Sequence, residues 1–180
     1  MKTVHGMRRR LGGAVGLALV LTCLFAVWPA QAGHEITQWK AAATPALKLP
    51  DLNGVAWSLE QHRGKVVLVN FWATWCEPCR AEMPSMQALT DKFGPEKLVV
   101  VGVNYQENEM RIQRFLSNMP VLKFTILLDR DGEAARAWTR RIFPTTVLVG
   151  PDGRARSVIV GEFDWAGADA EKMVRDLLRR

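Results

Sequence analysis

Apolar runs alternate along the chain with segments whose apolar residues recur every three or four positions. The runs cover 65–72, 98–103 and 124–128, and uninterrupted runs of this length are typical of strands buried on both faces of a sheet. Segments with helical spacing follow them, ending at 93, 119 and 138 respectively. Because buried strands that alternate with helices need crossover connections, this order predicts a parallel section of sheet.

Shorter strand signals flank this region. Residues 46–59 resemble two short strands around the turn Asn53-Gly54, which predicts an N-terminal β-hairpin extension. Predicted strands at 145–149 and 155–160 are joined by Pro151-Asp152-Gly153, and a helix at 171–180 closes the chain. The predicted fold class is therefore α/β, with a central mixed β-sheet flanked by helices. Residues 33–44 are interpreted as a lead-in segment, because they show no clear period.

The first 32 residues have the layout of an export signal. Arg8-Arg9-Arg10 forms a positive region, 11–28 is an uncharged apolar run, and Pro29-Ala30-Gln31-Ala32 supplies small residues for signal peptidase. We predict a signal peptide at 1–32 and a periplasmic or otherwise extracytoplasmic protein. The alternative is an uncleaved signal anchor in the inner membrane, because an 18-residue run is near the lower limit for a membrane span.

The charge balance argues against a nucleic-acid partner. The chain has 24 Lys and Arg against 18 Asp and Glu, a net charge of +6. Four of the basic residues and none of the acidic ones lie in 1–32, so the remainder has 20 against 18, or +2. A nucleic-acid-binding domain normally keeps a basic surface on its folded part.

The chain contains three cysteines, of which Cys23 lies in the leader and would be removed with it. Cys76 and Cys79 are too close in sequence to close a large loop, so a structural disulfide framework is a poor explanation. A zinc half-site would need two more ligands. The mature chain offers only His34 and His62, neither at metal-binding spacing. No metal or other cofactor is expected.

The sequence around the two cysteines indicates thiol chemistry. A buried strand leads directly into Cys76-Glu77-Pro78-Cys79 at the start of a helix, where proline suits the first turn. Free amides and the helix dipole at this position stabilise a thiolate, which is the species that attacks a disulfide. Cys79 lies one turn further along and could resolve the mixed disulfide.

The residues 71–79 (Phe-Trp-Ala-Thr-Trp-Cys-Glu-Pro-Cys), the proline within the following helix and the segment 143–146 (Phe-Pro-Thr-Thr) resemble the thioredoxin superfamily. The closer resemblance is to TlpA/ResA-like thiol–disulfide oxidoreductases of the cytochrome c maturation type, over about 45–178. It implies a thioredoxin-like domain at 45–180, with Cys76 as the exposed nucleophile and Cys79 as the resolving thiol. It also implies that Pro144 is cis and packs against the cysteine pair.

The resemblance implies further site residues. Phe143, Pro144 and Thr145 would bind an extended substrate segment, with Phe143 offering its backbone groups, and Trp75 would shield one side of the cysteine pair. The family has a partly buried acid at the position of Glu82 that exchanges protons with the cysteines.

Two acidic residues near the cysteine pair each have an alternative interpretation. Glu82 lies three residues after Cys79, on the same helix face, but an acid early in a helix can simply complement the helix dipole. Glu77 would oppose thiolate formation and, with Pro78, tune the pair towards a reducing potential. The alternative for Glu77 is a capping box with Thr74.

These features predict a protein-disulfide reductase that acts on exported clients. By resemblance, the clients would be apocytochrome c or a copper-site subunit, and the electrons would come from a membrane thiol donor of the DsbD/CcdA type. The protein is expected to be a monomer. A disulfide-forming oxidant or isomerase is the alternative, and Glu77 argues mildly against a strong oxidant.

Two other functions on the same fold fit the sequence less well. A copper chaperone would pair a Cys-x-x-x-Cys with a downstream histidine, and no histidine follows His62. A peroxidase would have a threonine three residues before its cysteine, where this chain has Ala73.

Overall fold

The computed structural model describes residues 33–180, and the leader predicted at 1–32 lies outside this range. Within the described range, no helix combines the length and the apolar character needed to cross a bilayer.

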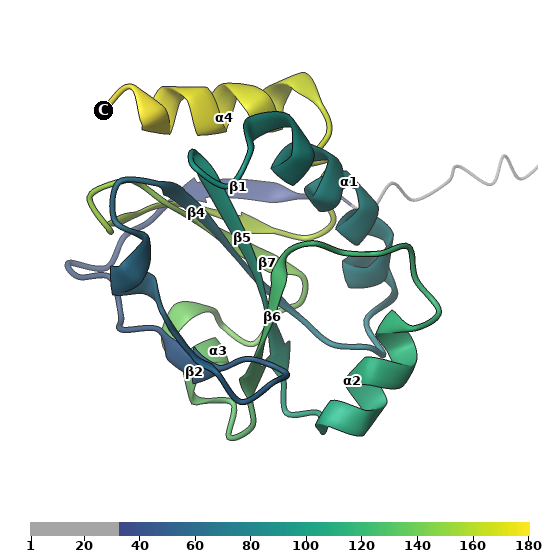
Figure 1. The fold of residues 1–180 in the computed structure, drawn as a ribbon. Coiled ribbons are helices and arrows are strands. Elements are labelled where there is room, and N and C mark those ends of the chain that lie inside the picture. Colours follow the sequence, from purple (N-terminus) through teal and green to yellow (C-terminus); the bar gives the residue numbers. More distant parts are fainter. Residues whose placement is uncertain (1–32) are drawn as a thin grey trace, which may run out of the picture. The chain divides into compact units, whose positions relative to one another are not determined.

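Six strands form one mixed sheet in the order β1-β8-β7-β4-β5-β6 (Figure 1). Strands β4, β5 and β6 are parallel, whereas β7, β8 and β1 continue the sheet from β4 in antiparallel pairs. The predicted mixed sheet is therefore confirmed. The strand bounds are Glu35–Gln38 (β1), Val66–Trp72 (β4), Leu98–Tyr105 (β5), Thr125–Asp129 (β6), Thr145–Val149 (β7) and Ala155–Val160 (β8).

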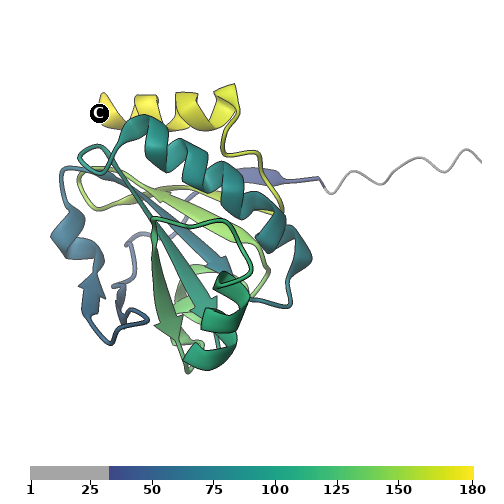
Figure 2. The same cartoon turned by 45° about the vertical axis from the view of Figure 1, so that its right-hand side comes forward.

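The two faces of the sheet are covered by different elements (Figures 1 and 2). Helices α1 (Glu77–Phe93), α2 (Glu109–Leu116) and α4 (Ala168–Leu178) bury apolar side chains against one face. The other face is covered by α3 (Glu133–Trp138), the 3-10 helix Leu59–His62 and the hairpin of β2 (Lys48–Pro50) and β3 (Ala56–Ser58). This hairpin is the predicted N-terminal extension.

Strand β4 is central because it is apolar on both sides. All seven of its residues are buried, and it is parallel to β5 on one side and antiparallel to β7 on the other. Its carboxyl end leads through residues 73–75 into Cys76 and α1. A fully buried strand thus fixes the position of the cysteine pair.

The lead-in predicted at 33–44 contains a strand that the sequence pattern did not indicate. Residues 35–38 form β1, which pairs antiparallel with β8 and makes an edge of the sheet. Three of its four residues are exposed, and its one hydrophobic residue, Ile36, is 47% exposed. An exposed edge strand has neither a continuous apolar run nor clean alternation, which explains the omission.

Candidate active site

Cys76 and Cys79 form a disulfide at the start of α1, with their Cα atoms 5.3 Å apart. Cys76 is the N-cap residue of this 17-residue helix, and a proline stands in its first turn, as predicted. Cys76 is 5% exposed and Cys79 is fully buried. The nucleophile expected to be exposed is therefore only slightly accessible in the disulfide form, although Cys76 is the more accessible of the two cysteines.

Glu82 is a buried acid, 2% exposed, on α1. Its Oε1 accepts a hydrogen bond from Asn70 Nδ2 at 2.7 Å, and its Oε2 accepts bonds of 3.2 Å from the Phe163 backbone N–H and from Trp165 Nε1. Burial raises the pKa of Glu82 to about 7, and these three hydrogen bonds offset part of that rise. An acid with this pKa can hold or release a proton near neutral pH.

The Phe143–Pro144 peptide bond is cis, as the resemblance implied. The Thr145 hydroxyl donates a hydrogen bond of 2.7 Å to the Ile142 carbonyl, and the Pro144 carbonyl accepts one of 2.9 Å from Gly161. Thr145 is 1% exposed, so this hydrogen bond stabilises the loop from its buried side. Among residues 33–180, no hydrogen bond involves the Phe143 N–H or carbonyl.

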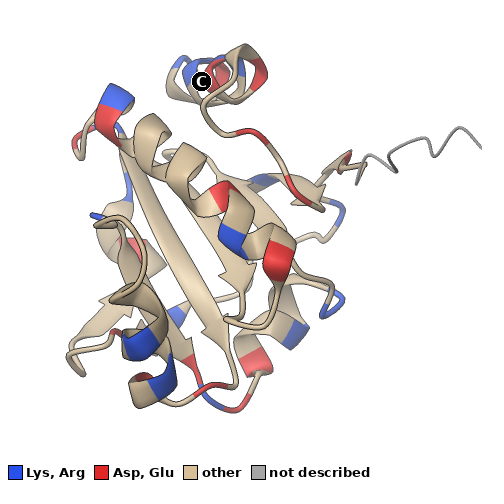
Figure 3. Cartoon of the chain, turned by 90° about the vertical axis from the view of Figure 1, so that its right-hand side faces the viewer, with Lys and Arg blue, Asp and Glu red and all other residues tan. Residues whose placement is uncertain are grey.

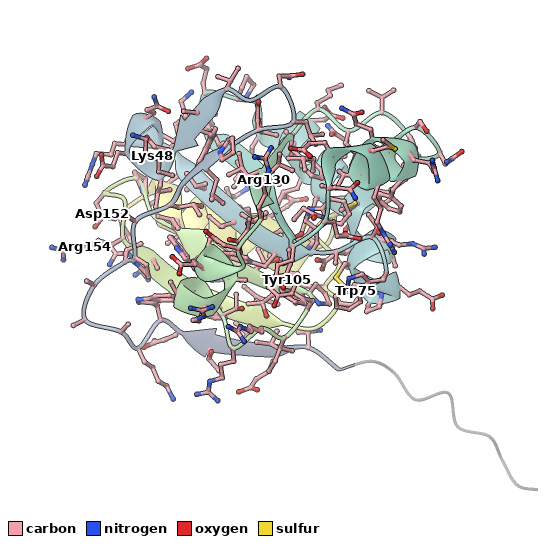
Figure 4. All side chains as sticks on the ribbon, turned by 90° about the horizontal axis from the view of Figure 1, so that it is seen from below. Lys48, Trp75, Tyr105, Arg130, Asp152 and Arg154 are labelled. Carbon is pink, nitrogen blue, oxygen red and sulfur yellow. A yellow bond between two sulfur atoms is a disulfide. The ribbon has the colours of Figure 1, made fainter. Side chains whose placement is uncertain are left out.

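Aromatic side chains connect this loop to the cysteine pair. Trp75, which precedes Cys76, is 58% exposed, and its ring meets the Phe143 ring edge-on at 6.1 Å between centroids. The Phe143 ring also packs against Tyr105 at 5.0 Å. Figure 4 shows Trp75 next to the yellow disulfide and Tyr105 on the same side of the molecule. Ile142, which precedes Phe143 in the chain, is 49% exposed.

Glu77 lies exposed between the two cysteines. The capping box proposed for Glu77 and Thr74 is wrong, because the N-cap residue is Cys76 and no side chain caps the helix. Thr74 instead donates its backbone N–H and its hydroxyl to Glu107, each at 2.6 Å. Glu77 is therefore free of this competing structural role.

Three residues of this region were missed by the sequence analysis. Asn70 lies within the apolar run of β4, and this isolated polar residue was an available signal for a buried hydrogen-bond network. Tyr105 ends β5 and Glu107 follows it. No spacing rule connects Tyr105 to Phe143, which lies 143 − 105 = 38 positions later, or Glu107 to Thr74, which lies 33 positions earlier.

Within 33–180, no group of three or more His, Cys, Asp or Glu side chains is arranged to hold a metal ion. The cysteine pair itself is present as a disulfide.

Comparison with known proteins gives a consistent picture. The model of the AhpC/TSA family matches residues 41–158. The thiol-disulfide oxidoreductase ResA of Bacillus subtilis is 31% identical over 173 residues, which is 95% of this chain and 93% of ResA. The thioredoxin-like protein YneN of the same organism is 32% identical over 158 residues, covering 86% of this chain and 91% of YneN.

Solved structures agree with the sequence relatives. A crystal structure from Chlorobium tepidum, assigned provisionally as the thiol:disulfide interchange protein DsbE, has a TM-score of 0.70 and 28% identity over 79% of this chain and 99% of its own. The structure of DsbF from MTB, in mixed oxidised and reduced forms, has a TM-score of 0.62 and 28% identity over 73% and 94%. The chain therefore belongs to the AhpC/TSA family and is a thioredoxin-fold thiol–disulfide oxidoreductase of the ResA/DsbE type.

Proposed function

We propose that this oxidoreductase reduces disulfides of exported proteins through the pair Cys76 and Cys79. The Cys76 thiolate attacks one sulfur of a client disulfide, forms a mixed disulfide and releases the other client sulfur as a thiolate. Cys79 then attacks the Cys76 sulfur, which releases the second client thiolate. Two electrons pass to the client, and the enzyme is left with the disulfide seen in the structure.

The observation that carries this proposal is the unpaired backbone of Phe143 beside the cysteine pair. An extended client segment can pair with these groups as a strand pairs with a sheet edge. The exposed Trp75 and the adjoining Phe143 ring would then contact the client's apolar side chains. Pro144 and the buried Thr145 hold the loop rather than contact the client through their side chains.

Glu82 supplies the proton transfer that resolution requires. Cys79 must lose its proton before it attacks, yet it is fully buried and has no contact with water. Glu82 lies one helical turn further along α1, and burial raises its pKa to about 7. In this proposal Glu82 accepts the Cys79 proton and later returns it when a donor reduces the pair.

The proposed reducing direction draws on the residues between the cysteines. The exposed carboxylate of Glu77 lies at the helix N-terminus where Cys76 would carry its negative charge. Repulsion between the two charges destabilises the thiolate and so favours a more reducing pair. Pro78 is the second residue of the helix, where its missing N–H costs no backbone hydrogen bond.

We propose an extracytoplasmic location through the signal at 1–32, with clients such as apocytochrome c or a copper-site subunit. Each is a substrate whose cysteines must be reduced before the cofactor or metal can bind. Because the donor must return two electrons across the membrane, we propose a membrane thiol protein of the DsbD/CcdA type. The proposed state is a monomer.

The direction is tested by the reduction potential of the full-length protein. We would equilibrate it in dithiothreitol redox buffers and read the oxidised fraction from thiol alkylation and tryptophan fluorescence, since Trp75 adjoins the disulfide. A value near or below thioredoxin's roughly −270 mV is expected. A value near the roughly −120 mV of a strong oxidant would overturn the reductase proposal in favour of disulfide formation.

A further inference from the structure

We infer that Glu107 is a positioning residue that holds the loop leading into Cys76. Its Oε2 accepts hydrogen bonds from the Thr74 backbone N–H at 2.6 Å and from Asn104 Nδ2 at 2.9 Å. Its Oε1 accepts the Thr74 hydroxyl at 2.6 Å and lies 2.7 Å from Arg111 Nε. The Glu107 side chain is only 6% exposed. The two carboxylate oxygens of Glu107 thus contact four donor groups in a largely buried environment.

The four donors come from segments that meet at one end of the sheet. Thr74 lies between the end of β4 and Cys76, in a tight turn where the Cys76 N–H donates to the Ala73 carbonyl at 3.1 Å. Asn104 lies on β5, directly opposite the last residue of β4. Arg111 lies on α2 and also donates to the Thr74 hydroxyl at 3.0 Å. Glu107 therefore fixes the Thr74 turn to both β5 and α2.

The arrangement requires a carboxylate. The Thr74 N–H, the Asn104 amide and the Arg111 guanidinium are all donors, so both oxygens of residue 107 must accept. A glutamine of the same shape would turn an NH2 group towards at least one donor. If the hydrogen bonds to residue 107 are broken, polar groups remain unpaired in a largely buried environment, which is costly. The Thr74 turn would then shift to pair these groups again.

This role rests on the function proposed above, because it matters through Cys76. The thiolate is stabilised only where its sulfur lies at the free amides of the α1 N-terminus. Exchange also needs the attacking sulfur in line with the client disulfide, and a misplacement of about 1 Å can cost about 100-fold in rate. Loosening the Thr74 turn should therefore weaken the thiolate and slow its attack.

The test compares full-length Glu107→Gln with the matched control Glu109→Gln. Glu109 is an acid two residues away that pairs with Arg130 and has no bond to Thr74. We would measure the pH profile of Cys76 alkylation by iodoacetamide in the reduced proteins, and the rate of exchange with insulin disulfides at pH 7. Glu107→Gln should shift the alkylation midpoint to higher pH and slow exchange by about tenfold. Glu109→Gln should match the wild type in both.

Several outcomes separate the possible failures. A lower unfolding temperature of Glu107→Gln with an unmoved alkylation profile and exchange rate would show a merely structural role and overturn the inference. If Glu107→Gln does not fold, Thr74→Val removes both hydroxyl bonds, the one to Glu107 and the one from Arg111, but keeps the backbone bond to Glu107. It should give a smaller shift in the same direction, while Thr74→Ser, which keeps the hydroxyl, should give none. Equal profiles for both variants overturn the inference. Wild-type protein that cannot reduce insulin would contradict the proposed function, while the alkylation profile would still test Glu107.

Discussion

At the scale of single residues, Glu82 shows opposing effects on one carboxyl group. Removal from water raises its pKa, whereas the donors on Trp165, Phe163 and Asn70 stabilise the charged form and lower it. The effect of burial is the larger, and the pKa rises from 4.5 to about 7. Because of the three hydrogen bonds, the charged form of Glu82 is populated near neutral pH. A group that accepts a proton from Cys79 must be charged before the transfer.

The raised pKa makes a prediction about stability. Because the folded protein holds the Glu82 proton up to about pH 7 and the unfolded chain loses it near 4.5, folding stability should fall as pH rises through this window. The loss has an upper limit of about 3 kcal/mol. Denaturant unfolding of the oxidised protein between pH 4.5 and 8 measures it. Glu82→Gln, which cannot titrate, should show a flatter dependence, and equal slopes for the two proteins would contradict the assignment.

The residue scale also shows the limit of sequence reasoning around Glu82. Its spacing of three from Cys79 was enough to place it on the same face of the helix. Its partners Asn70 and Trp165 come from β4 and from the segment before α4, 12 and 83 residues away. Such long-range pairing follows from the packing of α1 on the sheet, so helix periodicity alone could not predict it.

At the scale of elements, the sequence predicts strands and helices with a clear hydrophobic pattern well, and those with a weak pattern poorly. Strands β7 and β8 have the predicted bounds, and helix α3 ends at the predicted residue. Helix α4 starts at Ala168, three residues before the prediction, because its first turn contains only small and charged residues and thus no large apolar side chain to mark it.

Packing between β4 and β5 leads to a prediction at Gly102. A Cβ atom there would lie 3.0 Å from both Trp72 Nε1 and Ile126 Cδ1, and Trp72 is fully buried. Gly102→Ala should therefore lower the free energy of unfolding by about 1–3 kcal/mol through overpacking. Urea unfolding checks this against Gly33→Ala, where an added Cβ meets nothing within 4 Å and the change should stay below about 0.5 kcal/mol. If Gly102→Ala has the same free energy of unfolding as the wild type, the Trp72 side chain must be able to move away from the added methyl group.

At the scale of the whole molecule, the distribution of charged residues bears on the proposed extracytoplasmic location. Figure 3 shows acidic and basic residues interspersed over the visible face of the folded part, without a continuous basic stripe. Many of them are paired, as Asp152 is with Arg154 and Arg156. The excess positive charge is concentrated in the leader, where four basic residues precede the apolar run without any acid. This asymmetry fits a segment that directs export rather than a surface that binds nucleic acid.

The sequence of the leader predicts where signal peptidase cleaves the chain. Signal peptidase reads small residues at the two positions occupied by Ala30 and Ala32, so the exported protein should begin at Gly33. Intact mass measurement of the protein, expressed with its own leader in a bacterial host, checks this. Ala32→Leu should block cleavage and leave the full chain in the membrane fraction, while the folded part still forms the Cys76–Cys79 disulfide. Wild-type protein recovered with residues 1–32 attached would identify the apolar run as an anchor, which would hold the cysteine pair next to a membrane thiol donor.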